Sequence, residues 1–210
     1  THELTPTDSR LVFEHMGWRR IAGLHAKNIP NRAHEYIIKE SLSSYHCDGI
    51  LVHSDFGNDS SINHESDLTI KAYRYLSREY LPADTIIASK SPNYVRHTSI
   101  QREILFNAVC QKNYGCNMFL AGNESPISET SGSGIDKDTL VAISNDVGID
   151  MIVFDEIYYC EQCNIHTNQC LHAGNSRKKL RSRDVLDTMN SGQYPPDWQI
   201  RKDVADLALK

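Results

Sequence analysis

The sequence has 210 residues, a length typical of one domain with a substantial hydrophobic core. Its 22 Lys and Arg residues are outnumbered by 27 Asp and Glu residues, and the net charge of -5 argues against the basic surface that nucleic-acid binding requires. The longest apolar runs, such as residues 151–154, are far shorter than the roughly 20 residues of a membrane-spanning helix. We therefore expect a cytoplasmic protein that binds a small molecule, and neither a nucleic acid nor a membrane.

Short apolar runs alternate with longer segments of helical periodicity up to residue 154. In residues 67–80, for example, Leu68, Ala72, Tyr75 and Leu76 recur at the spacing of one helix face. Such alternation predicts an α/β fold in which right-handed crossovers place helices on both faces of a parallel sheet. The expected strands are residues 19–25, 49–53, 85–89, 117–121 and 151–154, and the expected helices are residues 32–43, 67–80, 100–112 and 136–147.

The C-terminal part of the chain has a different composition. Residues 157–172 are rich in Cys and Asn, residues 175–183 are basic, and residues 185–210 are expected to form helical pieces on either side of Pro195 and Pro196. We therefore predict two parts, a sheet domain at residues 1–156 and a small zinc-binding and helical subdomain at residues 157–210.

Three cysteines of this C-terminal part, Cys160, Cys163 and Cys170, lie within eleven residues and are followed by His172. Clustered cysteines favour metal binding over disulfides in a reducing compartment. A Cys-x2-Cys pair turns two thiolates toward one ion, and a second pair from the returning chain completes a tetrahedron, so the spacing predicts a closed, structural Zn²⁺ site. His166 is the alternative fourth ligand. The competing interpretation is three free thiols beside an unrelated histidine.

Polar side chains are concentrated in residues 25–35, directly after the first expected strand. Ligands of parallel α/β sheets bind at the carboxyl ends of the strands, and a helix N-terminus favours phosphate, so this turn is the candidate binding site. Asn31 and His34 are three residues apart, on one side of the expected helix, and Pro30 fits its first turn. The alternative is that Asn31 only caps the helix and that His34 is a partly buried polar residue.

Several segments along the chain match the motifs of one enzyme family. They are LTPTDSR at residues 4–10, GWRRI at residues 17–21, NIPNRAHEY at residues 28–36, KNYGC at residues 112–116 and YYCEQC at residues 158–163. Together they resemble ATP sulfurylase (sulfate adenylyltransferase) in order along nearly the whole chain, without the family's N-terminal PUA-like domain or a kinase domain.

This resemblance implies a Rossmann-like nucleotidylyltransferase fold. It also implies the family's reaction, in which AMP is transferred from ATP, bound with Mg²⁺, to sulfate and pyrophosphate is released. An adenine nucleotide and a small anionic acceptor are then the expected partners. The resemblance also allows a homo-oligomer, which is common in the family.

The family's substrate-binding motif is altered in this sequence. Aligned on residues 32–35, the family's Gln-Thr-Arg-Asn segment reads His-Ala-Lys-Asn at residues 25–28, and the first histidine of its His-x-x-His motif becomes Asn31. Lys27 keeps the positive charge of the family's Arg but lacks the planar group that binds an oxyanion at two points. Asn31 donates hydrogen bonds but never carries a positive charge.

The loop that closes the site in the family, Gly-Arg-Asp-His-Ala-Gly, is also changed. Here Gly122 is followed by Asn123 and Glu124, and the Glu124 carboxylate repels sulfate unless it turns away or holds magnesium. The family's Ser-Gly-Thr-Lys-Val-Arg segment becomes residues 181–186, at the end of a basic run at residues 177–183. This run is either a solvated loop or a source of cations for a triphosphate or an anionic acceptor.

We predict an ATP-sulfurylase-like enzyme that transfers AMP to sulfate or to another small oxyanion, such as a phosphate, phosphonate or sulfonate. The alternative is a non-catalytic relative that binds a nucleotide or a protein partner. The resemblance assigns oxyanion binding to Lys27 and Asn28, phosphate contacts to His34 and a weaker phosphate contact to Asn31. The other expected nucleotide- or acceptor-binding residues are His25, Gly122, Asn123, Glu124, Arg181 and Arg183.

Overall fold

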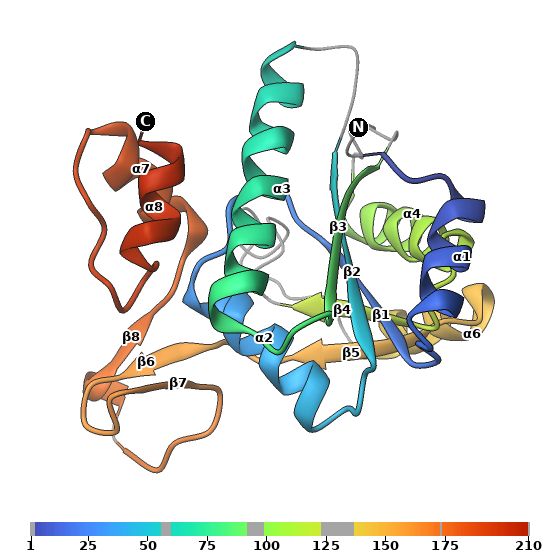
Figure 1. Cartoon of the computed structure of the whole chain (residues 1–210). Helices are drawn as coiled ribbons and strands as arrows, with labels where there is room; N and C mark the ends of the chain where they lie inside the picture. Colours follow the sequence, from blue (N-terminus) through green and yellow to red (C-terminus); the bar gives the residue numbers. More distant parts are fainter. Residues whose placement is uncertain (1–2, 56–59, 92–98, 123–136, 173, 210) are drawn as a thin grey trace.

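The centre of the molecule is a parallel sheet of five strands in the order β3-β2-β1-β4-β5 (Figure 1). The expected α/β fold with a parallel sheet is therefore confirmed. The computed structural model describes residues 3–55, 60–91, 99–122, 137–172 and 174–209. The strands are β1 (Ile21–His25), β2 (Gly49–Asp55), β3 (Ile86–Ser91), β4 (Met118–Gly122) and β5 (Asp150–Phe154).

The strand order reverses beside β1. The chain runs outward from β1 through β2 to β3, and then returns to place β4 on the other side of β1. In open parallel sheets, ligands bind outside the carboxyl ends of the strands at such a switch point. Residues 26–31, which leave β1 at its carboxyl end, lie at this position.

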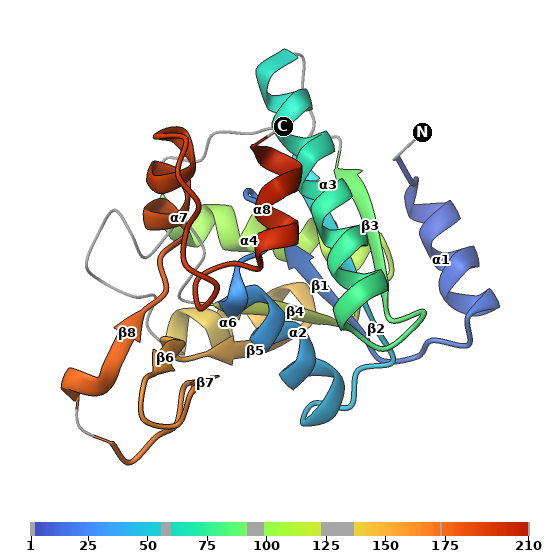
Figure 2. The same cartoon turned by 60° about the vertical axis from the view of Figure 1, so that its left-hand side comes forward.

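Helices cover both faces of the sheet (Figures 1 and 2). The strands alternate between two buried clusters, so that Ala22 and Leu24 of β1 belong to one hydrophobic core and Ile21 to the other. The first core lies under α2 (Arg32–Ser43), α3 (Ser60–Tyr80), α7 (Ser182–Asn190) and α8 (Lys202–Ala208), and the second under α1 (Pro6–His15), α4 (Ile100–Asn113) and α6 (Lys137–Val147).

In the described part of the chain, no helix is both long and apolar enough to cross a membrane.

Two groups of elements were not predicted. The helix α1 starts with a capping box, in which the side chains and backbone N–H groups of Thr5 and Asp8 bond reciprocally, and Pro6 occupies its first position. A small antiparallel sheet in the order β7-β6-β8 follows β5. Its strands have three residues each: β6 (Tyr158–Cys160), β7 (Ile165–Thr167) and β8 (Arg177–Lys179).

The C-terminal part packs on the sheet through a shared core. Ile157, Val185 and Ile200 lie in the same buried cluster as Ala22 and Leu24. The backbone N–H of Arg32, at the start of α2, donates to the carbonyl of Gln199 at 2.8 Å. The boundary predicted at residue 156 falls between β5 and β6 and stays a prediction.

A buried carboxylate connects α2 to the chain entering α8. The Glu35 side chain is 6% exposed, and Arg201 donates two hydrogen bonds to its two oxygens, both at 2.8 Å. Lys39 and Arg32 add hydrogen bonds at 2.5 and 2.9 Å. Burial raises the pKa of Glu35, but the hydrogen bonds from Arg201 and Lys39 and the charge of Arg32 outweigh it and lower the pKa to about 2. The carboxylate is therefore ionised, and the two-point contact with Arg201 fixes the C-terminal helices relative to α2.

We expect Arg201→Ala to lower the free energy of unfolding by about 3 kcal/mol, because it removes one partner of a buried ion pair. Lys39→Ala is the matched control, and its loss should be about 1 kcal/mol or less because the Lys39 side chain is half exposed. Urea unfolding at pH 7 measures both values. Equal losses for the two variants would contradict this ranking.

The same pair predicts acid sensitivity. Since the pKa of Glu35 falls from 4.5 to about 2 on folding, its stabilisation is complete above pH 4.5 and is lost as the pH falls through 2. Urea unfolding at pH 7 and pH 3 should therefore show a smaller pH-dependent loss for Arg201→Ala than for the unmodified protein. An unchanged loss would show that Glu35 is not the titrating group.

Candidate functional site

The turn from β1 to α2 is held by a reciprocal cap. Asn31 is the N-cap of α2, and its Oδ1 accepts the backbone N–H groups of Ala33 at 2.9 Å and His34 at 3.1 Å. The Nδ1 of His34 accepts the backbone N–H of Asn31 at 3.2 Å. These bonds fix the first turn of the helix. Pro30 lies just before the cap, and not in the first helical turn where its sequence position had suggested.

A second helix begins against this cap. The Nδ2 of Asn31 donates to the Oγ of Ser182, the first residue of α7, at 3.2 Å, and this bond is buried. Arg181 is the N-cap of α7, makes no side-chain capping bond and is exposed. Because helix N-termini carry partial positive charge, the meeting of α2 and α7 creates an environment that favours an anion.

His34 is an uncharged member of this site. Its side chain is buried, and burial lowers its pKa to about 4. The ring packs edge-on against Tyr73, with the centroids 6.2 Å apart. At neutral pH His34 therefore acts through hydrogen bonds and not through charge.

Lys27 faces the helices on the other side of the sheet from α2 and α7. Its ammonium group forms an ion pair with Glu103 of α4, and the two side chains are 33% and 18% exposed. Asn28 is half-buried next to it. The cation predicted to bind an oxyanion thus has a carboxylate partner from a residue 76 positions away.

Two histidines lie side by side at the carboxyl ends of β1 and β2. His25 is the register partner of His53, and its Nε2 lies 3.3 Å from the Oδ1 of Asp55. His53 is 1% exposed, and neither of its ring nitrogens has a hydrogen-bond partner among the described residues. Burial and the neighbouring His25 lower the pKa of His53 to about 3, against the opposing effect of Asp55.

His53 and Asp55 were not among the site residues predicted from the sequence. The available signal was that polar side chains continue at the end of the strand expected at residues 49–53, as they do after β1. The ends of neighbouring parallel strands meet at one edge of the sheet, so polar residues at both ends belong to one region.

The remaining predicted residues fall into three groups. Gly122 is the last residue of β4, the strand next to β1, whereas Asn123 and Glu124 lie outside the described residues. Arg183 is exposed, and its Nε lies 3.8 Å from the Oδ2 of Asp187. In β8, Arg177 packs over Tyr158, while Lys178 pairs with Glu161 at 2.5 Å and Lys179 with Glu156 at 2.9 Å.

The basic run is therefore divided between two environments. Its first half, in β8, is occupied with neighbouring acidic and aromatic side chains. Only its second half begins α7 at the Asn31 cap.

Three sulfurs and one imidazole nitrogen converge in the C-terminal part. The Nδ1 of His172 lies 3.5, 3.2 and 3.1 Å from the sulfurs of Cys160, Cys163 and Cys170. Cys163 and Cys170 are 3.5 Å apart, as are Cys170 and Cys160. Ligands bound to zinc at about 2.0–2.3 Å in a tetrahedron are separated by roughly 3.5–3.8 Å. The separations here, 3.1–3.5 Å, lie at or slightly below this range, so a small outward movement of the side chains would accommodate such an ion. His166 lies elsewhere, with its Nε2 2.7 Å from the carbonyl of Trp198.

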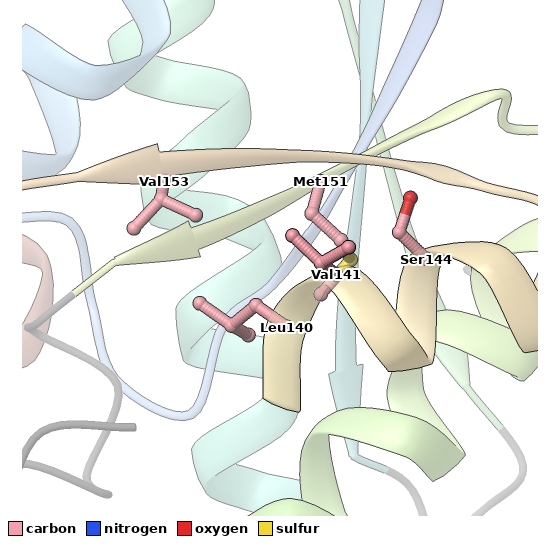
Figure 3. A pocket seen from close by; sticks show the side chains of 5 residues that line it. All are labelled: Leu140, Val141, Ser144, Met151 and Val153. Atoms are coloured by element: carbon pink, nitrogen blue, oxygen red, sulfur yellow. The ribbon is translucent and has the colours of Figure 1, made fainter. Parts of the chain in front are cut away.

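A pocket of about 230 Å³ lies between α6 and β5, away from all these groups (Figure 3). Ser144 supplies its hydroxyl, which already donates to the carbonyl of Ile149 at 2.9 Å. Lacking titratable side chains, this pocket offers no chemistry for group transfer. Its other lining residues are Leu140, Val141, Met151 and Val153.

The family model for ATP-sulfurylase matches residues 1–210. The chain belongs to the ATP-sulfurylase family. Among similar proteins are the sulfate adenylyltransferases of Symbiobacterium thermophilum, 28% identical over 213 residues, and Aeropyrum pernix, 27% identical over 210 residues. These alignments cover 100% and 99% of this family member, but 53% and 54% of the relatives. The chain thus spans about half the length of the curated relatives that it matches.

A solved structure shares the fold of this ATP-sulfurylase family member. It is described as a hexameric APS kinase from Thiobacillus denitrificans, with a TM-score of 0.75 and 22% identity. The match covers 99% of the present chain and 39% of that chain. At this identity the likeness establishes the fold alone.

The Asn31 cap can be tested with two substitutions. Asn31→Ala removes both the capping oxygen and the bond to Ser182, and we expect it to lower the free energy of unfolding by about 2 kcal/mol. Asn31→Asp keeps a capping oxygen and loses only the amide donor, so its loss should be about half as large. Urea unfolding distinguishes them, and a larger loss for Asn31→Asp would contradict the role of the cap.

Proposed function

We propose that the chain is an adenylyltransferase that transfers AMP from ATP to a small oxyanion and releases pyrophosphate. The observation that carries this proposal is the junction of the α2 and α7 N-termini at the carboxyl end of β1. A triphosphate fits this junction because the partial positive charges of the two helix N-termini favour an anion there. Membership of the ATP-sulfurylase family and relatives named sulfate adenylyltransferase support AMP transfer as the reaction.

On the nucleotide side, His34 would hydrogen-bond an α- or β-phosphate oxygen, and Asn31 would keep the helix N-terminus in place. Arg181, exposed at the start of α7, would supply the positive charge that neutral His34 does not. Gly122, at the end of β4, would line the nucleotide, and Arg183 would contact the triphosphate from α7. Mg²⁺ would arrive bound to the triphosphate and neutralise part of its charge.

On the acceptor side, Lys27 and Asn28 would hold the oxyanion. An acceptor oxygen attacks the α-phosphorus, the bond from that phosphorus to the oxygen bridging to the β-phosphate breaks, and pyrophosphate leaves with the bonding electrons. The chain's contribution is to position the reactants and neutralise charge, which requires cations and N–H donors and no protein nucleophile. Acceptor binding at Lys27 would compete with its ion pair to Glu103.

Two substitutions separate the nucleotide and acceptor roles. We expect His34→Ala to weaken ATP binding, and Lys27→Ala to raise the KM of the acceptor while ATP binding remains, each by about 10-fold or more because one hydrogen bond to a charged group is lost. Calorimetry with ATP and a pyrophosphate-release assay provide the two measurements.

Lys178→Ala is the control, because it removes a half-exposed cation of β8 that pairs with Glu161. If the double variant Lys27→Ala/His34→Ala retains both ATP binding and pyrophosphate release, the proposed placement is wrong. Circular dichroism of each variant establishes that the fold is retained.

We also propose that Cys160, Cys163, Cys170 and His172 bind Zn²⁺. Their mutual distances and soft donor set favour this ion, and four protein ligands leave no open position for a substrate. The ion would stabilise the strands β6 and β7, which have only three residues each. It would therefore act on folding and not on the transfer step.

Elemental analysis should then find one zinc per chain. A strong chelator should lower the melting temperature by roughly 5–10 °C, because a few kcal/mol of folding free energy comes from the metal. Cys163→Ser should melt at the lower temperature already and respond little to chelator. A zinc-free protein whose melting temperature is unchanged by chelator would rule out the site.

A further inference from the structure

The His25–Asp55 pair lies where the proposed acceptor would bind. His25 ends β1, two residues before Lys27, and its side chain is 12% exposed. Asp55 ends β2 and is 20% exposed. Both groups are therefore near the surface of the carboxyl edge, and neither is closed off in the core.

Asp55 determines which ring nitrogen of neutral His25 faces a ligand without a proton. The Oδ1 of Asp55 lies 3.3 Å from Nε2, so of the two neutral tautomers of the ring it favours the one that carries its proton on Nε2. In this tautomer the Nδ1 atom has a lone pair, which only accepts hydrogen bonds. The described residues provide no hydrogen-bond donor to this atom.

The surrounding charges also disfavour an oxyanion that carries no proton. Glu103 neutralises Lys27, and Asp55 faces His25, so both of these groups have a carboxylate beside them. His53, which lies next to His25 in the sheet, is buried and uncharged at neutral pH and adds no positive charge. An oxyanion without a proton would meet a lone pair on His25 and two carboxylates.

We propose that His25 and Asp55 select a protonated phosphorus oxyanion as the acceptor, either hydrogen phosphate or a phosphonate, in preference to sulfate. Near pH 7 these oxyanions retain one O–H group, whereas sulfate has none. The O–H group donates to Nδ1 of His25, while the unprotonated oxygens face Lys27 and Asn28. Sulfate at the same place would bring two sets of lone pairs into contact, which is repulsive.

This inference rests on the proposed AMP transfer and specifies its acceptor. An unprotonated oxygen of the acceptor attacks the α-phosphorus, pyrophosphate leaves with the bonding electrons, and the acceptor's own proton stays on its oxygen. With hydrogen phosphate the product is ADP, and with a phosphonate it is a mixed anhydride of AMP. No proton transfer to the protein is required.

The test compares inorganic phosphate, methylphosphonate and sulfate at pH 7. The zinc-loaded protein is saturated with Mg²⁺ and a non-hydrolysable α,β-methylene analogue of ATP, and the binding of each anion is measured by calorimetry. Pyrophosphate release with ATP gives kcat/KM for each acceptor. We expect phosphate or methylphosphonate to exceed sulfate by about 10-fold or more in both measurements, and the two phosphorus compounds distinguish an inorganic acceptor from an organic one.

His25→Gln supplies an amide N–H donor at the same position, and we expect it to reduce the preference over sulfate by about 10-fold. His15→Gln, an exposed position at the end of α1, is the matched control and should leave the preference unchanged.

Equal binding of the three anions, or a preference that His25→Gln does not change, would overturn the inference and leave AMP transfer standing. Failure to bind the ATP analogue would overturn the proposed function instead, while the binding of the anions to the nucleotide-free protein would still decide whether His25 discriminates.

Discussion

The reciprocal cap between Asn31 and His34 is the interaction on which the site depends. It sets where α2 begins, and therefore where the partial positive charge of this helix N-terminus points. The same Asn31 side chain reaches Ser182 and so defines the start of α7. One residue further along α2, Glu35 binds Arg201 and holds the C-terminal helices against the sheet. The proposed anion binding and the packing of the C-terminal part thus depend on the same turn of helix.

The charge at this edge of the sheet is balanced and not strongly positive. Lys27 and His25 each have a carboxylate neighbour, while His34 and His53 are buried and neutral at pH 7. Helix N-termini, the exposed Arg181 at the start of α7 and the magnesium that accompanies ATP would then be the principal sources of positive potential for phosphates. At such a site the proposed acceptor would be recognised by its hydrogen-bond pattern more than by its charge, which is the property that distinguishes a protonated oxyanion from an unprotonated one.

Much of the fold could be predicted from the sequence because buried parallel strands and amphipathic helices have distinct periodicities. The predicted bounds of α2 are those observed, whereas α3 begins at Ser60 and not at residue 67. Helix α1 was missed, although Thr5, Pro6 and Asp8 form a recognisable start signal. The strands β6, β7 and β8 have only three residues each, too few to show a period.

The zinc ligand set could be proposed from spacing, but contacts between distant elements could not. Spacing left His166 and His172 open, and the structure places His172 with the three sulfurs. The pairing of Lys27 with Glu103, and of Asn31 with Ser182 across 151 positions, depends on how helices pack on the sheet.

The most direct test of the whole account is the fate of the label when the zinc-loaded protein acts on ATP labelled in the γ-phosphate, with Mg²⁺ and the three anions. Attack at the α-phosphorus predicts that the label leaves in pyrophosphate, whereas label in the acceptor or in orthophosphate would contradict AMP transfer.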